Sequence, residues 1–215
     1  MANVPLMSVV INNYNYGRFL RDAIDSALAQ THSSTEVIVV DDGSTDESRE
    51  VIAAYHGRVV PVLKSNGGQA SAYNAGFAAC HGEWICFLDS DDTLYPQALE
   101  VVAAVVAAEP SVVKVQLTLA VTDAEGRPTG QLSTQRPPPE GDLSALVARD
   151  GPLYDFHTHT GSVYSRSVLQ AVLPAPEAPY RNGADVYLIT LAPIFGVIRN
   201  AAGALGTYRA HGNNN

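Results

Sequence analysis

The sequence predicts an α/β protein with a mostly parallel sheet that is flanked by helices. Three observations support this class. Short apolar runs alternate with segments of helical periodicity from residue 6 to about residue 121. These runs are continuously apolar, as strands of a parallel sheet covered on both faces are. The 215 residues are 46% hydrophobic and 16% charged, so the chain has a globular composition and can bury a substantial core.

The chain up to residue 121 predicts five strands and four helices in alternation. The strands are expected at residues 6–11, 36–40, 58–63, 84–88 and 112–121. The helices are expected at residues 18–30, 44–55, 69–80 and 96–109. Residues 44–47 read Ser-Thr-Asp-Glu, a capping box that would open the second helix. Pro61 cannot donate a ladder hydrogen bond, so the third strand is expected at an edge of the sheet.

The remainder of the chain has a weaker pattern. Residues 123–141 are rich in proline and glycine and predict a loop. Only short elements are expected after this loop. They are a helix at 142–149, a strand at 161–165, a helix at 184–195 and a strand at 197–208.

The charge of the chain argues against nucleic acid as a partner. The formal net charge is −9, and the only lysines are Lys64 and Lys114. A surface that binds nucleic acid needs basic side chains to neutralise phosphates. An acidic protein can still bind a phosphorylated small molecule, and a bound cation would help it to do so.

The sequence predicts a cytoplasmic protein. Its first residues lack the basic segment and the apolar length of a signal peptide. The longest apolar run, residues 101–108, is shorter than the roughly 20 residues of a membrane span. Cys80 and Cys86 are too few for a disulfide framework or a zinc site and are expected as reduced thiols. Peripheral contact with a membrane, through a partner or a lipid-linked substrate, stays open.

Polar side chains follow each of the first four predicted strands. Open parallel sheets bind ligands outside the carboxyl ends of their strands, so these residues are expected at one edge. The four groups are Asn12-Asn13-Tyr14-Asn15, Asp41-Asp42-Gly43-Ser44, residues 64–69, and Asp89-Ser90-Asp91-Asp92. Acidic and amide side chains are costly to bring together unless they bind something, so this edge is the predicted ligand site.

The acidic run at residues 89–92 predicts a metal site. Neighbouring carboxylates raise one another's pKa values, and a divalent cation relieves their repulsion. Oxygen ligands suit magnesium or manganese, which keep open positions for substrate phosphates. A turn that caps the next helix is the alternative for this run. Residues 41–44 could likewise be a capped turn, and Gly67-Gly68 either a tight turn or a backbone that approaches a phosphate.

Four strings resemble those of the family 2 glycosyltransferases in their order and spacing. They are SVVINNYN at 8–15, VIVVDDGSTD at 37–46, NGGQASAYNAG at 66–76 and FLDSDD at 87–92. The resemblance implies the GT-A fold, a Rossmann-like sheet that binds a nucleotide-diphosphate sugar. It also implies transfer of the sugar to an acceptor hydroxyl with inversion, assisted by Mn²⁺ or Mg²⁺. UDP is the default nucleotide, ahead of dTDP and GDP.

The resemblance carries roles over to individual residues. Asp91 would ligate the metal, and Asp89 would lie near both the ribose and the metal. Asp41 would pair with the nucleotide base, with Asp42 as its neighbour. The residues implied in nucleotide binding are Asn12, Asn13, Tyr14, Asp41, Asp42, Asn66, Gly68, Gln69, Asp89 and Ser90. Family members more often have Pro-Thr at Asn12-Asn13, so this donor contact is expected to differ in detail.

Two later segments are similar to family motifs, but less closely. NGADVYLI at 182–189 resembles the motif that carries the catalytic base of inverting members, which would be Asp185. Ala184 replaces the acid that usually precedes this base. TYRAHGN at 207–213 resembles a segment whose histidine reaches the metal, and that histidine would be His211.

The same resemblance divides the domain into two halves. Residues 1–115 would bind the nucleotide sugar, and residues 116–215 would bind the acceptor and carry the catalytic base. GSVYSRSVL at 161–169 resembles an acceptor-side segment. His157 and His159 would flank it, and solvated loop histidines are the alternative for both. The sequence does not specify the acceptor, which in this family is a carbohydrate, a lipid-linked molecule or a protein.

Other functions remain as alternatives. FLDSDDTL at 87–94 also resembles the start of haloacid-dehalogenase-type phosphatases, in which Asp89 would be a nucleophile. That class needs a later lysine and an acidic pair, and Lys114 is the only later lysine. A nucleotidyltransferase would carry a glycine-rich basic loop near its start, which VVINNYNYGR lacks. A non-catalytic module that binds nucleotide sugars is the third alternative, because the match around Asp185 is weak.

Overall fold

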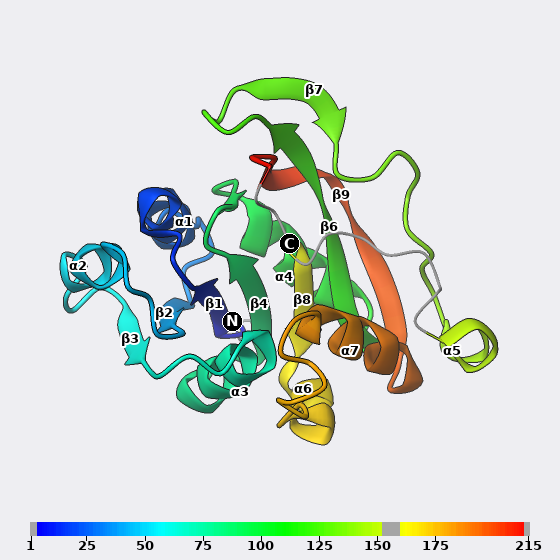
Figure 1. Cartoon of the computed structure of the whole chain (residues 1–215). Coiled ribbons are helices and arrows are strands. Elements are labelled where there is room, and N and C mark those ends of the chain that lie inside the picture. Colours follow the sequence, from blue (N-terminus) through cyan, green and yellow to red (C-terminus); the bar gives the residue numbers. More distant parts are fainter. Residues whose placement is uncertain (1–3, 152–159, 213–215) are drawn as a thin grey trace.

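The computed structural model describes residues 4–151 and 160–212, which form one mixed sheet flanked by helices (Figure 1). The strands are β1 (Met7–Asn13), β2 (Thr35–Asp41), β3 (Val60–Leu63), β4 (Trp84–Asp89), β5 (Thr93–Leu94), β6 (Val112–Thr122), β7 (Pro128–Leu132), β8 (Ser162–Ser165) and β9 (Val197–Arg209). The helices are α1 (Gly17–Leu28), α2 (Ser48–Ala53), α3 (Gln69–Ala79), α4 (Ala98–Ala108), α5 (Ser144–Asp150), α6 (Arg166–Val172) and α7 (Ala184–Leu191), followed by the 3₁₀ turn η2 (Ala192–Ile194).

The sheet has the strand order β3-β2-β1-β4-β8-β6-β9-β5, and β7 pairs with the far end of β6. The first four strands in this order are parallel, and β6 and β9 are parallel to each other. The short strand β8 runs antiparallel between β4 and β6. In β1, Asn12 is in register with Asp89 of β4, and Asn13 is in register with Asp41 of β2. The polar residues that end these strands therefore meet at one edge.

Helices cover both faces of the sheet, as the continuous apolar strands predicted. Successive residues of β1 point to opposite faces. Val9 and Ile11 pack in one core cluster with Leu20 of α1, and Val10 packs in a second cluster with Tyr73 of α3. Pro61 lies in the edge strand β3, also as predicted.

The predicted capping box at residues 44–47 is wrong. The helix α2 begins only at Ser48. The backbone N–H of Ser48 donates a hydrogen bond to the Asp46 carboxylate at 3.1 Å. The Ser44 hydroxyl instead accepts hydrogen bonds from the backbone of Asn15 at 2.9 Å and from the Asn13 amide at 3.1 Å. Ser44 therefore ties the loop after β2 to the loop after β1, which a local capping pattern cannot reveal.

The prediction of a loop at 123–141 is wrong for its first part. The strand β7 forms a hairpin with β6. Asp123 organises the turn, because its carboxylate accepts hydrogen bonds from the backbone of Glu125 and Arg127 at 3.0 and 2.8 Å. Pro128 and Gly130 are residues typical of loops, and all five residues of β7 are exposed, so the composition of this segment did not predict a strand.

Shorter elements also differ from the prediction. The helix expected at 184–195 ends at Leu191 and gives way to η2, which contains Pro193. The helix α6 and the two-residue strand β5 were not predicted. Such short elements are formed by their tertiary contacts and carry little periodicity of their own.

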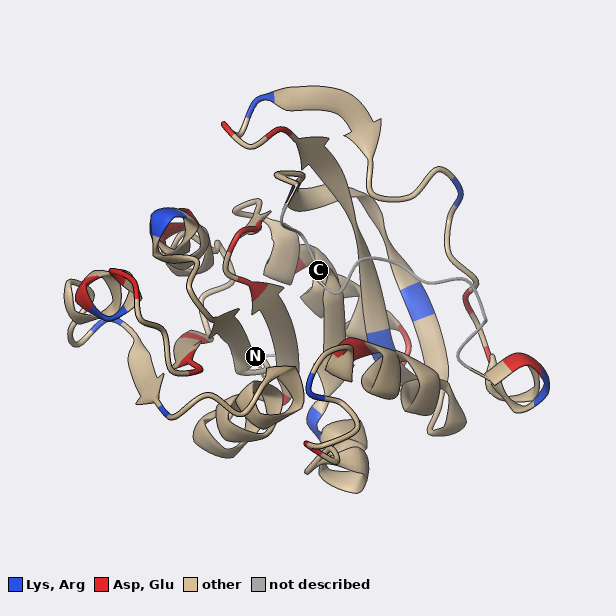
Figure 2. Ribbon diagram, viewed as in Figure 1, with Lys and Arg blue, Asp and Glu red and all other residues tan. Residues whose placement is uncertain are grey.

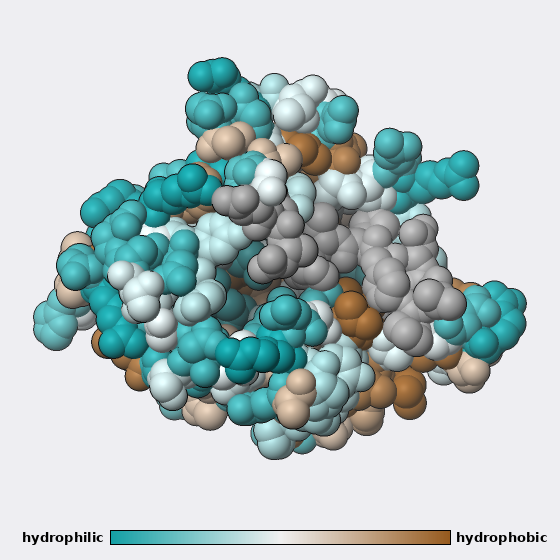
Figure 3. Space-filling model, in the orientation of Figure 1, coloured by the Kyte–Doolittle hydropathy of each residue, from teal (hydrophilic) through white to brown (hydrophobic). Residues whose placement is uncertain are grey.

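Among the helices of the described residues none has the length and apolar character that crossing a bilayer requires. The face in Figure 3 is mostly hydrophilic, with apolar patches scattered over it. Cys80 and Cys86 are buried and unbonded to each other, as the sequence predicted.

Candidate active site

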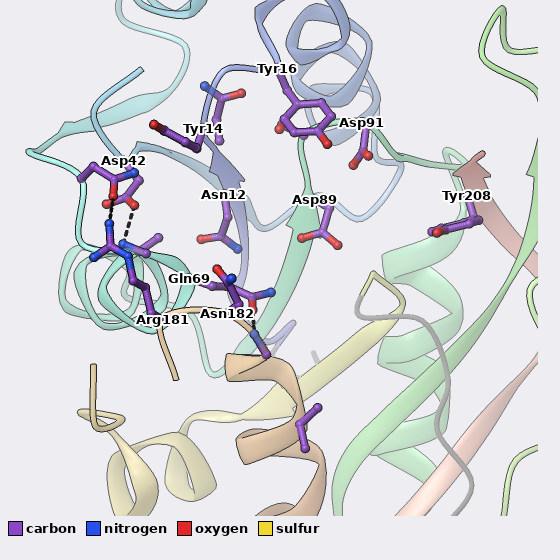
Figure 4. Close-up of a pocket in the computed structure, with 17 residues that line it drawn as sticks. Asn12, Tyr14, Tyr16, Asp42, Gln69, Asp89, Asp91, Arg181, Asn182 and Tyr208 are labelled. Carbon is purple, nitrogen blue, oxygen red and sulfur yellow. Dashed lines mark hydrogen bonds between the residues drawn. The ribbon is translucent and has the colours of Figure 1, made fainter. Parts of the chain in front are cut away.

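A cavity of about 480 Å³ opens at the carboxyl ends of β1, β2 and β4 (Figure 4). The loops after these strands form one wall, and the segment that leads into α7 forms another. Its lining residues are Asn12, Asn13, Tyr14, Tyr16, Asp42, Asn66, Gly68, Gln69, Ala72, Asp89, Ser90, Asp91, Arg181, Asn182, Gly183, Val186 and Tyr208. The polar residues that the sequence placed at this edge therefore lie around one concave space.

The two aspartates that follow β2 have different surroundings. Asp41 is fully buried and does not line the cavity. Its carboxylate accepts hydrogen bonds from Arg49 Nε at 2.8 Å and from the Asn13 amide at 3.2 Å. Asp42 does line the cavity. Of this pair, only Asp42 can touch a molecule bound there in the described arrangement.

Asp42 also holds the glycine-rich turn before α3. Its carboxylate accepts hydrogen bonds from the backbone N–H groups of Gly67 at 3.0 Å and Gly68 at 2.7 Å. Lys64 Nζ lies 2.5 Å from the same carboxylate. Gly68 has φ +89°, and a Cβ there would come within 2.5 Å of Arg181. A glycine is required at this position for both reasons.

Gln69 joins the two walls of the cavity. Its side-chain carbonyl accepts hydrogen bonds from the backbone N–H of Gly183 at 2.7 Å and Ala184 at 2.9 Å. The backbone N–H of Gln69 in turn bonds to the carbonyl of Arg181 at 2.7 Å. These bonds satisfy amides at the start of α7 and fix that helix against α3.

The acidic turn after β4 faces the cavity from the side opposite Asp42 (Figure 4). Asp89 and Asp91 line the cavity, and His211 Nε2 lies 2.9 Å from Asp91 Oδ2. The His211 side chain is only 1% exposed, and its ring lies 4.9 Å from that of Phe19. The structure therefore places side by side two of the residues that the sequence predicted as metal ligands, Asp91 and His211, and their role as ligands stays a prediction.

Asp92 stabilises this turn from behind. It is buried and accepts a hydrogen bond from the backbone N–H of Arg209 at 2.8 Å. Burial raises the pKa of its carboxyl well above the usual range, and the charges of Asp91 and Asp89 raise it further. Acidic residues mark the segments after β2 and β4 in Figure 2, so negative charge is concentrated at this end of the sheet.

The donor set suits a hard divalent cation. Carboxylate oxygens and an imidazole nitrogen are ligands that Mn²⁺ accepts, and Mg²⁺ accepts the oxygens. The mutual electrostatic effect of Asp89, Asp91 and Asp92 is the repulsion that a cation would relieve. Within the described residues no group of three His, Cys, Asp or Glu side chains is arranged to hold a metal ion. A cation here would need further ligands from a bound substrate.

Asp185 lies in the first turn of α7 and is 3% exposed. It does not line the cavity, although Gly183 and Val186 beside it do. The buried Lys114 of β6 is close enough for the Asp185 charge to oppose the fall in its pKa. Burial nevertheless lowers the pKa of Lys114 to about 7. Figure 2 shows the acidic start of α7 beside the basic position on β6.

The structure adds residues that the sequence reading did not identify. Tyr16, Arg181, Asn182 and Tyr208 line the cavity. Burial and the nearby aspartates raise the pKa values of Tyr16 and Tyr208. Tyr208 and Arg181 come from segments more than 80 residues away from the acidic turn, so no local motif could have pointed to them. His157 and His159 lie outside the described residues.

A family model and known relatives both identify this chain as similar to glycosyltransferases. The family model described as Glycosyl transferase family 2 matches residues 8–173. An uncharacterized glycosyltransferase of Nostoc sp. is 40% identical over 213 residues, which are 97% of this chain and 66% of the relative. A hyaluronan synthase of Pasteurella multocida is 46% identical over 100 residues, which are 45% of this chain and 10% of that protein.

Solved structures share the architecture. S. aureus TarS, in a form comprising residues 1–349, superposes with a TM-score of 0.70 at 22% identity, over 95% of this chain and 60% of that one. A mannosyltransferase of Pyrobaculum calidifontis, solved with GDP-Man and Mn²⁺, superposes with a TM-score of 0.65 at 20% identity, over 96% of this chain and 57% of that one. The chain thus spans about two thirds or less of the length of these relatives.

Proposed function

This chain belongs to glycosyl transferase family 2 and has the GT-A fold, and from that premise we propose that it transfers a sugar from a UDP-sugar to an acceptor hydroxyl. The observation that carries the proposal is the cavity, which has amide and acidic groups at one end and the Asp89–Asp91 turn at the other. TarS has been solved with UDP and with UDP-GlcNAc, which supports UDP as the nucleotide. The match over residues 8–173 favours transfer over the phosphatase alternative.

In this proposal the nucleotide occupies the end of the cavity formed by β1, β2 and the glycine-rich turn. Asn12, Asn13 and Tyr14 contact it from the loop after β1, and Asp42 accepts the N–H of the base. Asn66, Gly68 and Gln69 line the adjoining wall, and Ser90 lies beside the ribose. Asp41 acts indirectly, since its carboxylate accepts a hydrogen bond from the Asn13 amide and so orients a residue that makes contact.

The diphosphate lies against the acidic turn. Asp91, Asp89 and His211 would hold Mn²⁺ or Mg²⁺ there, and the bound cation supplies the positive charge that stabilises the leaving diphosphate. Tyr16 and Tyr208 keep their protons, because burial and the nearby carboxylates raise their pKa values. Both phenols can therefore donate hydrogen bonds to phosphate oxygens.

Asp185 is the proposed general base. Its carboxylate is buried beside the cavity-lining residues Gly183 and Val186, so binding of the acceptor must expose it. It removes the proton from the acceptor hydroxyl as the oxygen attacks the anomeric carbon. The bond from that carbon to the diphosphate breaks in the same step, so a single displacement inverts the anomeric centre. Residues 1–115 supply most of the donor site, to which Tyr208 and His211 are added from the second half, and residues 116–215 supply the base and the acceptor surface. The acceptor itself is a carbohydrate, a lipid-linked molecule or a protein.

The direct test is turnover of a panel of nucleotide sugars. The folded protein is incubated with UDP-, dTDP- and GDP-sugars and Mn²⁺, and release of nucleoside diphosphate is measured with and without simple sugar acceptors. Release from UDP-sugars that an acceptor accelerates supports the proposal. Tight binding without any release would favour the non-catalytic module. Release of inorganic phosphate from phosphomonoesters instead would favour the phosphatase.

A further inference from the structure

We propose that Arg181 determines the base specificity of the donor site by donating a hydrogen bond to a carbonyl of a pyrimidine-dione base. This inference rests on the proposed function, because it assigns a ligand to the same cavity. Among the residues that the structure describes, Arg181 is the one cationic side chain that lines the cavity, where it accompanies Asp42, Asp89 and Asp91. A single cation among three acids calls for a specific role.

The position of Arg181 separates it from the diphosphate. Figure 4 shows Arg181 on the same side of the cavity as Asp42 and Tyr14, with Asp91 and Tyr208 on the opposite side. The acidic turn at that opposite side is where a cation and phosphates would lie. Arg181 therefore faces the other end of a bound nucleotide, which is its base.

The guanidinium is held in place and retains donors for a ligand. Its Nη2 donates a hydrogen bond to the side-chain carbonyl of Asn66, and the backbone carbonyl of Arg181 accepts from Gln69 N at 2.7 Å. A guanidinium carries five N–H donors, and the bond to Asn66 engages one of them. The side chain packs directly over Gly68, where a Cβ would meet it at 2.5 Å. Ordering before binding reduces the entropy lost on binding.

Asp42 supplies the complementary acceptor. Its Oδ1 accepts from Lys64 Nζ and Gly67 N, whereas within the described part of the chain its Oδ2 accepts from Gly68 N alone. A carboxylate has about four acceptor sites, so Oδ2 can take one more N–H. The half-exposed ring of Tyr14, at 48% exposure, provides an apolar face at the same end for stacking.

An acceptor beside a donor matches the edge of uracil and opposes that of cytosine. Uracil presents an N3–H donor between the carbonyl oxygens O2 and O4, so Asp42 accepts from N3–H and Arg181 donates to O4. Cytosine keeps O2 but has an unprotonated N3 and an amino group in place of O4, which would set acceptor against acceptor and donor against donor. Unpaired polar groups of this kind cost much more than the lost bonds alone.

The test measures dissociation constants of UDP and CDP with Mn²⁺ for the wild type and for Arg181→Gln, Arg181→Lys and the surface control Arg58→Gln. Wild type and control are expected to prefer UDP. Arg181→Gln is expected to weaken the binding of UDP about tenfold to a hundredfold and the binding of CDP by less than about threefold. The affinity of Arg181→Lys for UDP is expected to lie between those of the wild type and Arg181→Gln. Lysine keeps the long stem and the charge, so this variant carries the test if glutamine disturbs folding.

Unchanged affinity for UDP in both Arg181 variants would overturn the proposal. Equal losses for UDP and CDP would also overturn it, because Arg181 would then act on the phosphates or on folding. Equal dissociation constants of the wild type for UDP and CDP would contradict recognition of the base by Arg181 while leaving the proposed function intact. A wild type that binds no nucleotide would instead remove the proposed function itself.

Discussion

At the scale of single residues, Asp91 carries the clearest chemical assignment. It lines the cavity and contacts His211 at 2.9 Å. We expect Asp91→Ala to lower kcat/KM with a UDP-sugar and Mn²⁺ by at least about a hundredfold, because loss of a charge-stabilising group typically costs that much. The matched control is Asp25→Asn. Asp25 is a surface carboxylate on α1 that accepts a hydrogen bond from the Tyr55 hydroxyl at 2.8 Å. Activity of Asp91→Ala within about tenfold of the wild type would refute the assignment.

Asp185 is expected to affect chemistry rather than binding. Asp185→Asn keeps the size of the side chain and removes the base, so kcat should fall by about 10²- to 10⁴-fold while the dissociation constant for UDP stays within about twofold. Steady-state kinetics and calorimetric titration of the same protein separate the two effects. An unchanged kcat would place the base elsewhere, for example among the cavity-lining carboxylates.

Lys114 predicts a pH dependence of stability. Its pKa is about 7 in the folded chain, where burial lowers it, against 10.5 as the reference value. Between these values the unfolded chain binds the proton and the folded chain does not, so the free energy of unfolding should rise with pH. The rise from pH 7 to 9.5 is expected to reach about 3 kcal/mol, and Lys114→Met should abolish it. The free energy of unfolding of both proteins is measured by urea denaturation from about pH 7 to 9.5. The same change with pH in the wild type and in Lys114→Met would contradict the prediction.

The sequence located the residues that line the cavity wherever a strand end positions them. Asp42, Asn66, Asp89 and Asp91 line the cavity because the parallel strands place their carboxyl ends in register. The sequence could not distinguish Asp41 from Asp42, since the direction of a side chain at a strand end depends on partners such as Arg49. Arg181 was missed because it reaches the cavity only through the packing of its segment on Gly68.

At the scale of elements, the contact between α3 and α7 couples the donor side to the proposed base. Gln69→Ala removes the acceptor of two amides at the start of α7. Leaving such groups unsatisfied should lower the free energy of unfolding by about 1–3 kcal/mol and weaken UDP binding. Gln97→Ala, at an exposed position before α4, is the control and should have little effect. Equal stability of the two variants by chemical denaturation would show that Gln69 does not hold α7.

Elements were predictable where their own sequence determines them. The strands β1, β2 and β4 each contain a run of apolar residues, and α1 has a regular apolar face, so these elements were predicted. The hairpin strand β7 is fully exposed and therefore carries no hydrophobic pattern. Residues 44–47 fit a local capping rule, but Ser44 forms a long-range bond with Asn13 instead. Local sequence rules failed where a side chain forms a long-range contact instead of the local one that the rule assumes.

At the scale of the whole molecule, the sheet joins a parallel donor side to a mixed side that carries α7 and β9. The strand β9 pairs with β6 and with β5, so it brings Arg209 and His211 to the acidic turn. Arg209 donates to the backbone carbonyl of Asp91 at 3.2 Å and to the Asp22 carboxylate at 2.8 Å. The last described strand therefore completes a site that begins at the first one.

Calorimetric titration with UDP in the presence of Mn²⁺, repeated after EDTA treatment, is the decisive experiment on the proposed donor site. A metal-assisted donor site predicts binding with one-to-one stoichiometry that EDTA weakens at least about tenfold, because the diphosphate then faces Asp89 and Asp91 without a cation. Equal affinity in EDTA would contradict the role of the metal. Absence of binding by a folded protein, with dTDP and GDP also inert, would contradict the nucleotide-sugar site as a whole.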